Sequence, residues 1–327
     1  FAGTRAHHIT PPKMAAMVAT ASPSSSFPTA LDLISSKDPA YFTKMVDLTA
    51  SCPALVQAYN AANPTSQIRL LGKCEHLNPG MSHKDRIAKV MLQRAEARDE
   101  LTNKATGEKK VILAASSGNT GCSLALVGTL MGYEVVIITN AKCSMEKRTH
   151  IRANGATLWL AESLPSDFPE QLGSETDYMK QEDLLAAAFP DKYYSVNQYG
   201  NMDNMDAHCD STGAEIWAQT GGSVTHFVMS GSTGGTIQGV GKCLKERRAD
   251  VEVVLADPDK SNLAGLMQRR SDPAAAAVTL AEVERMTKAT GGIKVEGAGK
   301  GSLTGIMQCG GACLQYVDRS IAVNDFD

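Results

Sequence analysis

Hydrophobic positions between residues 110 and 260 occur in short, nearly continuous runs that alternate with longer stretches of mixed polarity. Such runs predict strands buried on both faces, and the mixed stretches predict helices that cover them. The expected strands are 111–114, 134–139, 157–160, 193–196, 225–229 and 251–256. The expected helices are 121–131, 145–154, 206–220 and 235–248. This alternation indicates an α/β fold with parallel-type sheets covered by helices.

Length and charge narrow the class of protein further. A chain of 327 residues with 43% hydrophobic side chains is long enough to form two lobes with a cleft between them. The net charge is −3 and the 32 basic residues are scattered, which argues against binding to nucleic acid or to an anionic membrane surface. The longest apolar stretches, such as 124–131, are far shorter than the roughly 20 residues of a membrane span. We therefore expect a soluble protein with no membrane contact.

The N-terminal 31 residues differ in composition from the rest. They contain no acidic side chain, include Arg5 and Lys13, and carry a serine-rich run at 22–26. This composition is typical of an organelle transit peptide and equally of a disordered leader. We expect an intracellular, cytoplasmic protein, with a plastid or a mitochondrion as the alternative compartment.

The eight cysteines lie mostly in apolar, regularly patterned segments, which indicates reduced thiols that pack as small hydrophobic side chains. Cys309 and Cys313 are closely spaced, but two further ligands for a zinc ion are missing nearby. We expect no metal site.

The first candidate for chemistry is Lys84, in segment 78–86, which reads NPGMSHKDR. It lies between a glycine-containing turn and an amphipathic run at 85–97, so it is expected to begin a helix. The positive end of the helix dipole disfavours the ammonium ion there and favours the neutral amine, which is the form that makes a Schiff base. The alternative is an ordinary solvated surface lysine.

The second candidate is a polar segment between the strand at 111–114 and the next helix. Its residues are Ser116, Ser117, Gly118, Asn119, Thr120 and Gly121. Backbone N–H groups and hydroxyls at a helix N-terminus bind anions such as carboxylate or phosphate. An ordinary helix cap would explain one of these polar residues but not all of them.

The third candidate is a run of small and hydroxyl-bearing residues between the strand at 225–229 and the helix at 235–248. Its residues are Ser230, Gly231, Ser232, Thr233, Gly234, Gly235 and Thr236. This context suits a phosphate cradle. It also suits a dinucleotide-binding turn with Asp257 as the ribose-binding acid, although the glycine spacing departs from G-x-G-x-x-G. A nicotinamide-dependent dehydrogenase is therefore an alternative, but it leaves Lys84 unexplained.

The three segments together resemble those of the fold-type II pyridoxal-phosphate enzymes, most closely the cysteine synthase and cystathionine β-synthase family. The resemblance runs from about Gln67 to the last residue. It implies that Lys84 carries pyridoxal 5′-phosphate and transfers protons. It also implies that residues 116–120 bind the substrate carboxylate, that Asn119 meets the ring hydroxyl of the cofactor, and that residues 232–236 hold its phosphate.

Two further segments carry the resemblance. Gln198 and Tyr199 resemble the glutamine–aromatic pair of the family's active site, which implies contact with the substrate. Gly297 and Gly299 resemble a Gly-x-Gly segment that lines the far side of the cofactor.

The resemblance also implies a division into two lobes. A smaller substrate-loop domain is expected at about 77–190, and a larger cofactor-phosphate domain at 32–76 and 191–327. The family's C-terminal segment has no counterpart before residue 327, so the larger domain is expected to be incomplete.

The expected reaction is β-replacement on serine or O-acetylserine, in which a thiol or sulfide is added and cysteine or cystathionine is formed. The resemblance implies a homodimer. Several positions depart from the family pattern. Ser116 replaces the usual threonine, His83 stands where a small apolar residue is usual, Ser232 replaces a glycine, and Lys300 replaces an aromatic or small residue. The last three departures motivate the alternative of a non-catalytic regulatory or structural subunit that retains the fold.

Overall fold

The computed structural model describes residues 28–163, 175, 177–259, 261–270, 298, 304–311 and 314–324. Within them lies a parallel sheet of four strands in the order β5-β4-β3-β6. The strands are β3 (Val111–Ala115), β4 (Val135–Thr139), β5 (Thr157–Leu160) and β6 (Tyr193–Ser195). Every residue of β3 and β4 is buried, as expected for continuous apolar strands that are covered on both faces.

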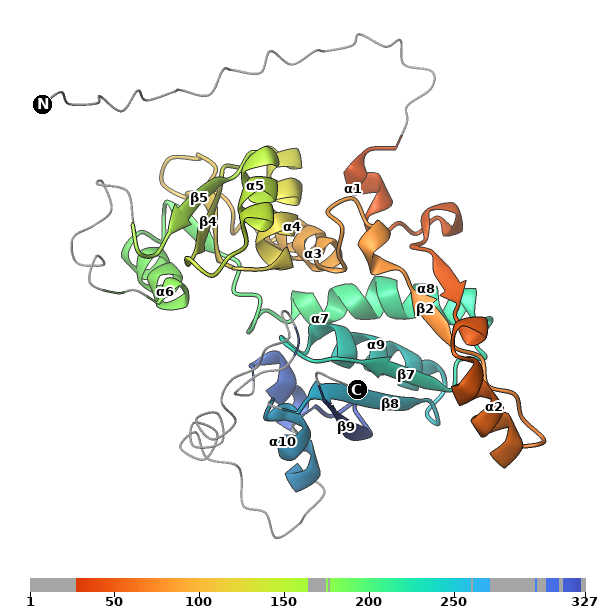
Figure 1. Cartoon of the computed structure of the whole chain (residues 1–327). Coiled ribbons are helices and arrows are strands. Elements are labelled where there is room, and N and C mark those ends of the chain that lie inside the picture. The colour runs from red at the N-terminus through yellow and green to blue at the C-terminus, as the bar shows by residue number, and fades with distance from the viewer. Residues whose placement is uncertain are drawn as a thin grey trace, which may run out of the picture.

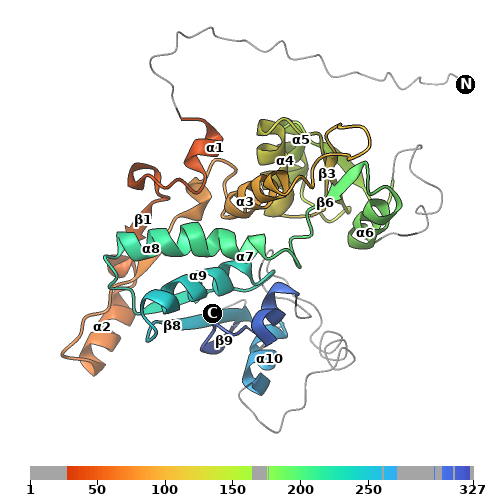
Figure 2. The same ribbon diagram turned by 180° about the vertical axis from the view of Figure 1, so that it is seen from behind.

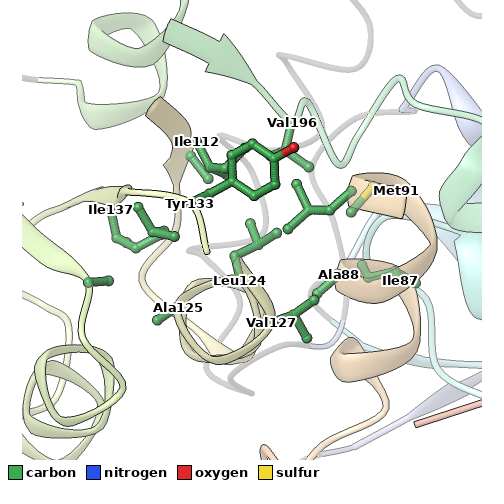
Figure 3. Close-up of a cluster of buried hydrophobic side chains, with 14 of the residues drawn as sticks. Ile87, Ala88, Met91, Ile112, Leu124, Ala125, Val127, Tyr133, Ile137 and Val196 are labelled. Carbon is green, nitrogen blue, oxygen red and sulfur yellow. The ribbon is translucent and has the colours of Figure 1, made fainter. Parts of the chain in front are cut away.

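Four helices accompany this sheet: α3 (Lys84–Ala97), α4 (Asn119–Leu130), α5 (Met145–Ala153) and α6 (Tyr178–Ala188). Helix α4 packs between α3 and the sheet, where side chains such as Leu124, Met91 and Ile112 meet (Figure 3). Gly128 allows this close packing, because a Cβ atom there would lie 2.5 Å from Val135 Cγ2. The start of α3 is thereby held against a rigid core.

A second parallel sheet has the order β7-β8-β9. Its strands are β7 (His226–Met229), β8 (Glu252–Pro258) and β9 (Arg319–Val323), and its helices are α9 (Gly235–Arg247) and α10 (Leu263–Arg270). Ile237 of α9 packs on Val253 and Leu255 of β8 in a separate hydrophobic cluster. A short 3₁₀ segment, η6 (Ile306–Gly311), adds Met307 to this core.

A nearly continuous helical rod lies between the two sheets. It consists of α7 (Asp203–Ala207), a π-helical turn η5 (His208–Gly213) and α8 (Ala214–Gln219). Figures 1 and 2 view the molecule from opposite sides, and both place the rod between the region of β3 to β6 and the region of β7 to β9. Residues of this rod are therefore within reach of loops from both sheets.

The first described residues form a small unit that bonds α8 through Lys73 and packs against α3 through Ile34. It contains α1 (Ala30–Leu33), the antiparallel pair β1 (Met45–Asp47) and β2 (Leu71–Lys73), and α2 (Pro53–Ala62). Three short 3₁₀ turns join these elements: η1 (Pro39–Tyr41), η2 (Thr49–Ser51) and η3 (Glu75–Leu77).

The structure confirms the predicted α/β architecture with parallel sheets. Two helices differ from expectation. Helix α4 begins at Asn119 rather than at residue 121, and the single helix predicted at 206–220 is a rod that starts at Asp203 and contains a π turn. No helix in the described ranges is both long and apolar enough to cross a membrane.

Candidate active site

Lys84 is the first residue of α3, as the sequence predicts. The turn before it is fixed by Asp85, whose carboxylate accepts hydrogen bonds from Gly80 N at 2.5 Å and from Ser123 Oγ at 2.6 Å. Only glycine fits at position 80, because a Cβ atom there would lie 2.3 Å from Asp85 Oδ1. Ser82 Oγ accepts from Lys84 N at 3.2 Å. These bonds set the direction in which the lysine leaves the helix.

The Lys84 side chain is partly buried, and burial lowers its pKa from the usual 10.5 to about 8. Its Nζ lies 2.5 Å from His83 Nε2. A lysine with this pKa is neutral in a substantial fraction of molecules near pH 8. The sequence predicts a neutral amine from the helix dipole, whereas the structure indicates loss of solvent as the cause.

Behind Lys84, a buried ionic network ties α3 to the rod. The guanidinium of Arg86 bonds Glu215 Oε1 of α8 at 2.5 Å and Glu75 Oε2 of η3 at 2.8 Å. Lys73 of β2 also bonds Glu215, at 2.5 Å. Arg86 itself is completely buried. The network anchors the first turn of α3, on which Lys84 sits, to elements beyond its own sheet.

The second predicted segment lies at the carboxyl end of β3 and opens α4. Ser116 Oγ accepts from Gly121 N at 2.9 Å and from Gly118 N at 3.3 Å, which curls the segment into a tight turn. Ser117 and Gly118 are partly exposed and Asn119 is exposed, so they lie at the surface of this turn. The turn presents the N-terminus of a twelve-residue helix to solvent, which suits a carboxylate.

The predicted pair Gln198 and Tyr199 lies beside this segment. Thr120 Oγ1 donates to Gln198 Oε1 at 2.7 Å. Thr120, Gln198, Tyr199 and the buried Glu182 line one cavity of about 500 Å³. Burial raises the pKa of Tyr199, with a further contribution from the charge of Glu182. The structure thus brings two of the predicted substrate-binding segments to one cavity.

The third predicted segment begins α9. Gly234 has a φ of 89°, a left-handed conformation that favours glycine, and a Cβ atom there would lie 2.6 Å from Met307 Cγ. At Gly235 a Cβ atom would lie 1.9 Å from Asn204 Oδ1. Ser232 is partly exposed and Thr233 is buried. The helix N-terminus and its hydroxyls form a small cup of the kind that holds phosphate.

Two residues of the rod join these segments, and the sequence analysis did not identify either. Asn204 Nδ2 donates to Gln198 O at 2.8 Å and to Thr233 Oγ1 at 3.3 Å. His208 Nε2 lies 3.1 Å from Thr236 Oγ1, and its ring centroid is 5.8 Å from that of His83. The sequence offered no clear signal for them, because the same helical stretch also carries Asp203, Asp206 and Asp210.

Contacts therefore link predicted site residues from four segments, at the starts of α3, α4 and α9 and in the loop before α7. Lys84 connects to the cup through the two imidazoles, and the cup connects through Asn204 to Gln198 and Thr120. Gly297 and Gly299 lie outside the described residues. In the described part of the chain, no three His, Cys, Asp or Glu side chains gather as a metal site requires.

The dehydrogenase alternative predicts an accessible acid at the end of β8. Asp257 is instead completely buried, and its Oδ2 accepts from Ala264 N at 2.9 Å. It caps the next helix and is not placed to meet a ribose.

Comparison with known proteins gives consistent matches. The family model described as "Pyridoxal-phosphate dependent enzyme" matches residues 53–326. Cysteine synthase from Aquifex aeolicus is 38% identical over 191 residues, which are 58% of this chain and 54% of that protein. Cystathionine beta-synthase from Apis mellifera is 36% identical over 194 residues, 59% of this chain and 36% of that protein. The chain thus spans about half of the first relative and a third of the second.

A solved structure agrees with these matches. O-acetylserine sulfhydrylase isoform 3 from Entamoeba histolytica superposes with a TM-score of 0.66 at 26% identity, and the match covers 99% of this chain and 77% of that one. The matches confirm the resemblance that was inferred from the order of the motifs.

Proposed function

Because the chain belongs to the family of pyridoxal-phosphate dependent enzymes, we propose that it catalyses β-replacement on serine or O-acetylserine, giving cysteine or cystathionine. The observation that carries this proposal is the position of Lys84. An amine with a pKa of about 8 connects, through His83 and His208, to a hydroxyl-lined helix N-terminus at Thr236. An amine and an anion cup that are linked by these contacts suit a ligand that carries a carbonyl and a phosphate.

The residues present fit the cofactor. A phosphate needs hydrogen-bond donors, and the N-terminus of α9 supplies N–H groups together with the nearby hydroxyls of Thr233 and Thr236. Glycine at 234 and 235 keeps Cβ atoms away from this helix start. Lys84 would hold the carbonyl carbon of the cofactor, and residues 232–236 would hold its phosphate.

When bound, the cofactor supplies a carbonyl that joins to an amine and a ring that withdraws electrons from the substrate's α-carbon. The chain supplies the rest. Lys84 Nζ in its neutral form is the base that takes the α-proton, and its pKa of about 8 is close to the pH of the cell, as efficient proton transfer requires. The amides of segment 116–121 bind the substrate carboxylate, and the Thr120–Gln198 hydrogen bond orients that segment over the cavity.

We also propose that the chain acts as a homodimer. Large apolar side chains are exposed on the N-terminal unit, among them Val46 of β1 and Leu55 and Tyr59 of α2. Their side chains are 41%, 54% and 38% exposed, respectively. Several exposed apolar side chains on one small unit suit an interface with a second copy of the chain. Light scattering of the purified chain tests this, and a monomer at micromolar concentration would contradict it.

The test of the catalytic proposal is an absorption spectrum of the purified chain with pyridoxal 5′-phosphate, before and after serine or O-acetylserine is added. We expect a visible band of lysine-bound cofactor that changes with one of the two amino acids. Lys84→Ala should abolish the band. Lys89→Ala is the matched control on the same helix, because Lys89 Nζ bonds the carbonyls of Leu31 and Ile34 instead.

Three outcomes separate the candidate functions. A Lys84-dependent band that responds to an amino acid supports the enzyme, and the responsive amino acid identifies the donor. A stable band with no response to either amino acid contradicts β-replacement on these donors. Absence of any band contradicts cofactor binding and favours a non-catalytic subunit. The unusual residues His83 and Ser232 are the reason for considering that alternative.

A further inference from the structure

His83 is the residue before the reactive lysine, and no helix-capping role explains it. It occupies the cap position of α3, but its side chain makes no capping hydrogen bond. Its Nε2 points instead at Lys84 Nζ, at 2.5 Å.

The ring of His83 lies between the lysine and the cup. Its centroid is 5.8 Å from that of His208, at an interplanar angle of 41°. His208 is held in turn by Thr212 Oγ1 at its Nδ1, 2.9 Å away, and by Thr236 Oγ1 at its Nε2. Three separate elements, α3, η5 and α9, thus fix the surroundings of the His83 ring.

The charged groups around His83 favour its neutral form. Burial and the charges of Lys84 and Arg86 lower its pKa well below the usual 6.5. His208, which faces it from η5, also has a strongly lowered pKa, from burial and from His83, Lys84 and Arg86. At neutral pH His83 is therefore uncharged. In the tautomer with its proton on Nδ1, Nε2 is an acceptor that faces an N–H donor.

We propose that His83 is a positioning residue for Lys84: its Nε2 accepts a hydrogen bond from Nζ and holds the amine on the side of the site that faces the phosphate cup. The proposal rests on the proposed role of Lys84 as the amine that carries the cofactor. In this role His83 orients the amine of Lys84 and does not itself take part in the reaction.

The hydrogen bond has a measurable consequence. An acceptor stabilises an ammonium ion more than a neutral amine, because charged donors make the stronger bonds. Burial lowers the pKa of Lys84 to about 8. On this proposal, the hydrogen bond from Nζ to His83 Nε2 keeps that pKa from falling further. Removal of the imidazole should lower the pKa of Lys84 by about one pH unit, and should also release the amine from its orientation.

The experiment follows the rate at which added pyridoxal 5′-phosphate becomes attached to the 327-residue chain, by the visible band, from pH 6 to 10. His83→Val removes the acceptor, and His83→Gln retains an acceptor oxygen without a titrating ring. In the valine variant we expect the midpoint of the rate profile to fall by about one pH unit and the plateau rate to fall about tenfold. In the glutamine variant we expect the midpoint to return to within about 0.3 pH units of the original.

A second ligand distinguishes two explanations of a slower attachment: a misplaced Lys84 amine and a damaged phosphate cup. Pyridoxamine 5′-phosphate carries the same phosphate but cannot join to the lysine, so its dissociation constant should change less than about twofold in both variants. A loss of more than tenfold would show that His83 shapes the cup, and would overturn the proposal.

Two other results would also overturn it. One is a rate profile in His83→Val that matches the original, and the other is a glutamine variant that behaves like the valine variant. Failure of the proposed function has a different signature, because the unmodified chain would then show no Lys84-dependent band at any pH.

Discussion

The buried arginine behind the reactive lysine allows a quantitative prediction of stability. In Arg86→Leu, the carboxylates of Glu215 and Glu75 lose their bidentate partner, and only Lys73 remains on Glu215. The side chain of Arg86 is completely buried and that of Glu215 is 3% exposed, so water cannot replace the bonds that Glu215 loses. Removal of one partner from a buried ion pair costs about 3–5 kcal/mol. We expect a loss of this size in the free energy of unfolding.

The assay is urea unfolding at pH 7, followed by far-ultraviolet circular dichroism. For a protein of this size, a loss of about 4 kcal/mol should lower the urea midpoint by more than about 1 M. Arg98→Ala is the matched control: Arg98 also pairs with two carboxylates, but its side chain is 43% exposed, so the midpoint should move far less.

The same network predicts a dependence on pH. Burial alone would raise the pKa of Glu215, but hydrogen bonds and charges from Arg86 and Lys73 lower it below the usual 4.5. A carboxyl group whose folded pKa is lowered stabilises the fold above its unfolded pKa, and this contribution is lost as the pH falls through the folded pKa. The difference in the free energy of unfolding between the original chain and Arg86→Leu should therefore become smaller below about pH 4.5. Two results would refute this account of the network. One is a loss of less than about 1 kcal/mol in the free energy of unfolding at pH 7, and the other is a difference between the two proteins that stays constant down to about pH 3.

Three smaller predictions concern the cup and the core. Gly235→Ala would place a Cβ atom 1.9 Å from Asn204 Oδ1, so an absorbance titration should show cofactor affinity at least about tenfold weaker; unchanged affinity would mean that the cup is not a binding site. Leu124→Ala removes a completely buried side chain between α3 and the sheet and should cost about 2–5 kcal/mol in urea unfolding. Tyr133→Phe removes a 2.6 Å hydrogen bond to Glu96 and should cost about 0.5–1.5 kcal/mol in the same assay.

The central strands β3 and β4 could be predicted from sequence because each is short, apolar and buried on both faces. The run predicted at 111–114 is β3, which extends by one residue to Ala115, and the run at 134–139 contains β4. The order of strands in each sheet could not be predicted in the same way, because it depends on contacts between residues far apart. Hydrophobic periodicity reports burial but carries no information about which neighbour covers a strand.

The chemical segments could be predicted because each combines unusual residues at the end of a strand or the start of a helix. Their mutual contacts could not. Arg86 and Glu215 are 129 residues apart, and Lys73 and Glu215 are 142 apart, so no local pattern links them. The sequence predicts a neutral Lys84 from the helix dipole, whereas the structure indicates that burial lowers its pKa. Burial depends on the packing of the whole chain, so the local sequence could not reveal this cause.

The helical rod was predicted as one regular helix, and its departure from regularity has a local reason. Ser211 Oγ donates to Ala207 O at 2.6 Å, a side-chain bond that competes with the backbone bonds of an α-helix. A π turn, with bonds from residue i to i+5, follows directly after Ala207. Gly213 accommodates the close approach of α9, since a Cβ atom there would lie 2.6 Å from Cys243 Cβ. Such turns occur frequently at functional sites.

The rod also explains how loops from two different sheets come to share one site. Asn204 and His208 are four residues apart, at the beginning of the rod, and residues at this spacing lie on one face of a helix. Asn204 bonds the segment that carries Gln198 and also Thr233 of the cup, while His208 bonds Thr236 and lies beside the ring of His83. One helical face therefore sets the distance between the cup and both substrate-side segments. The sequence could not single out this pair, because the rod also carries Asp203, Asp206 and Asp210, and only the packed structure shows which polar side chains meet the loops.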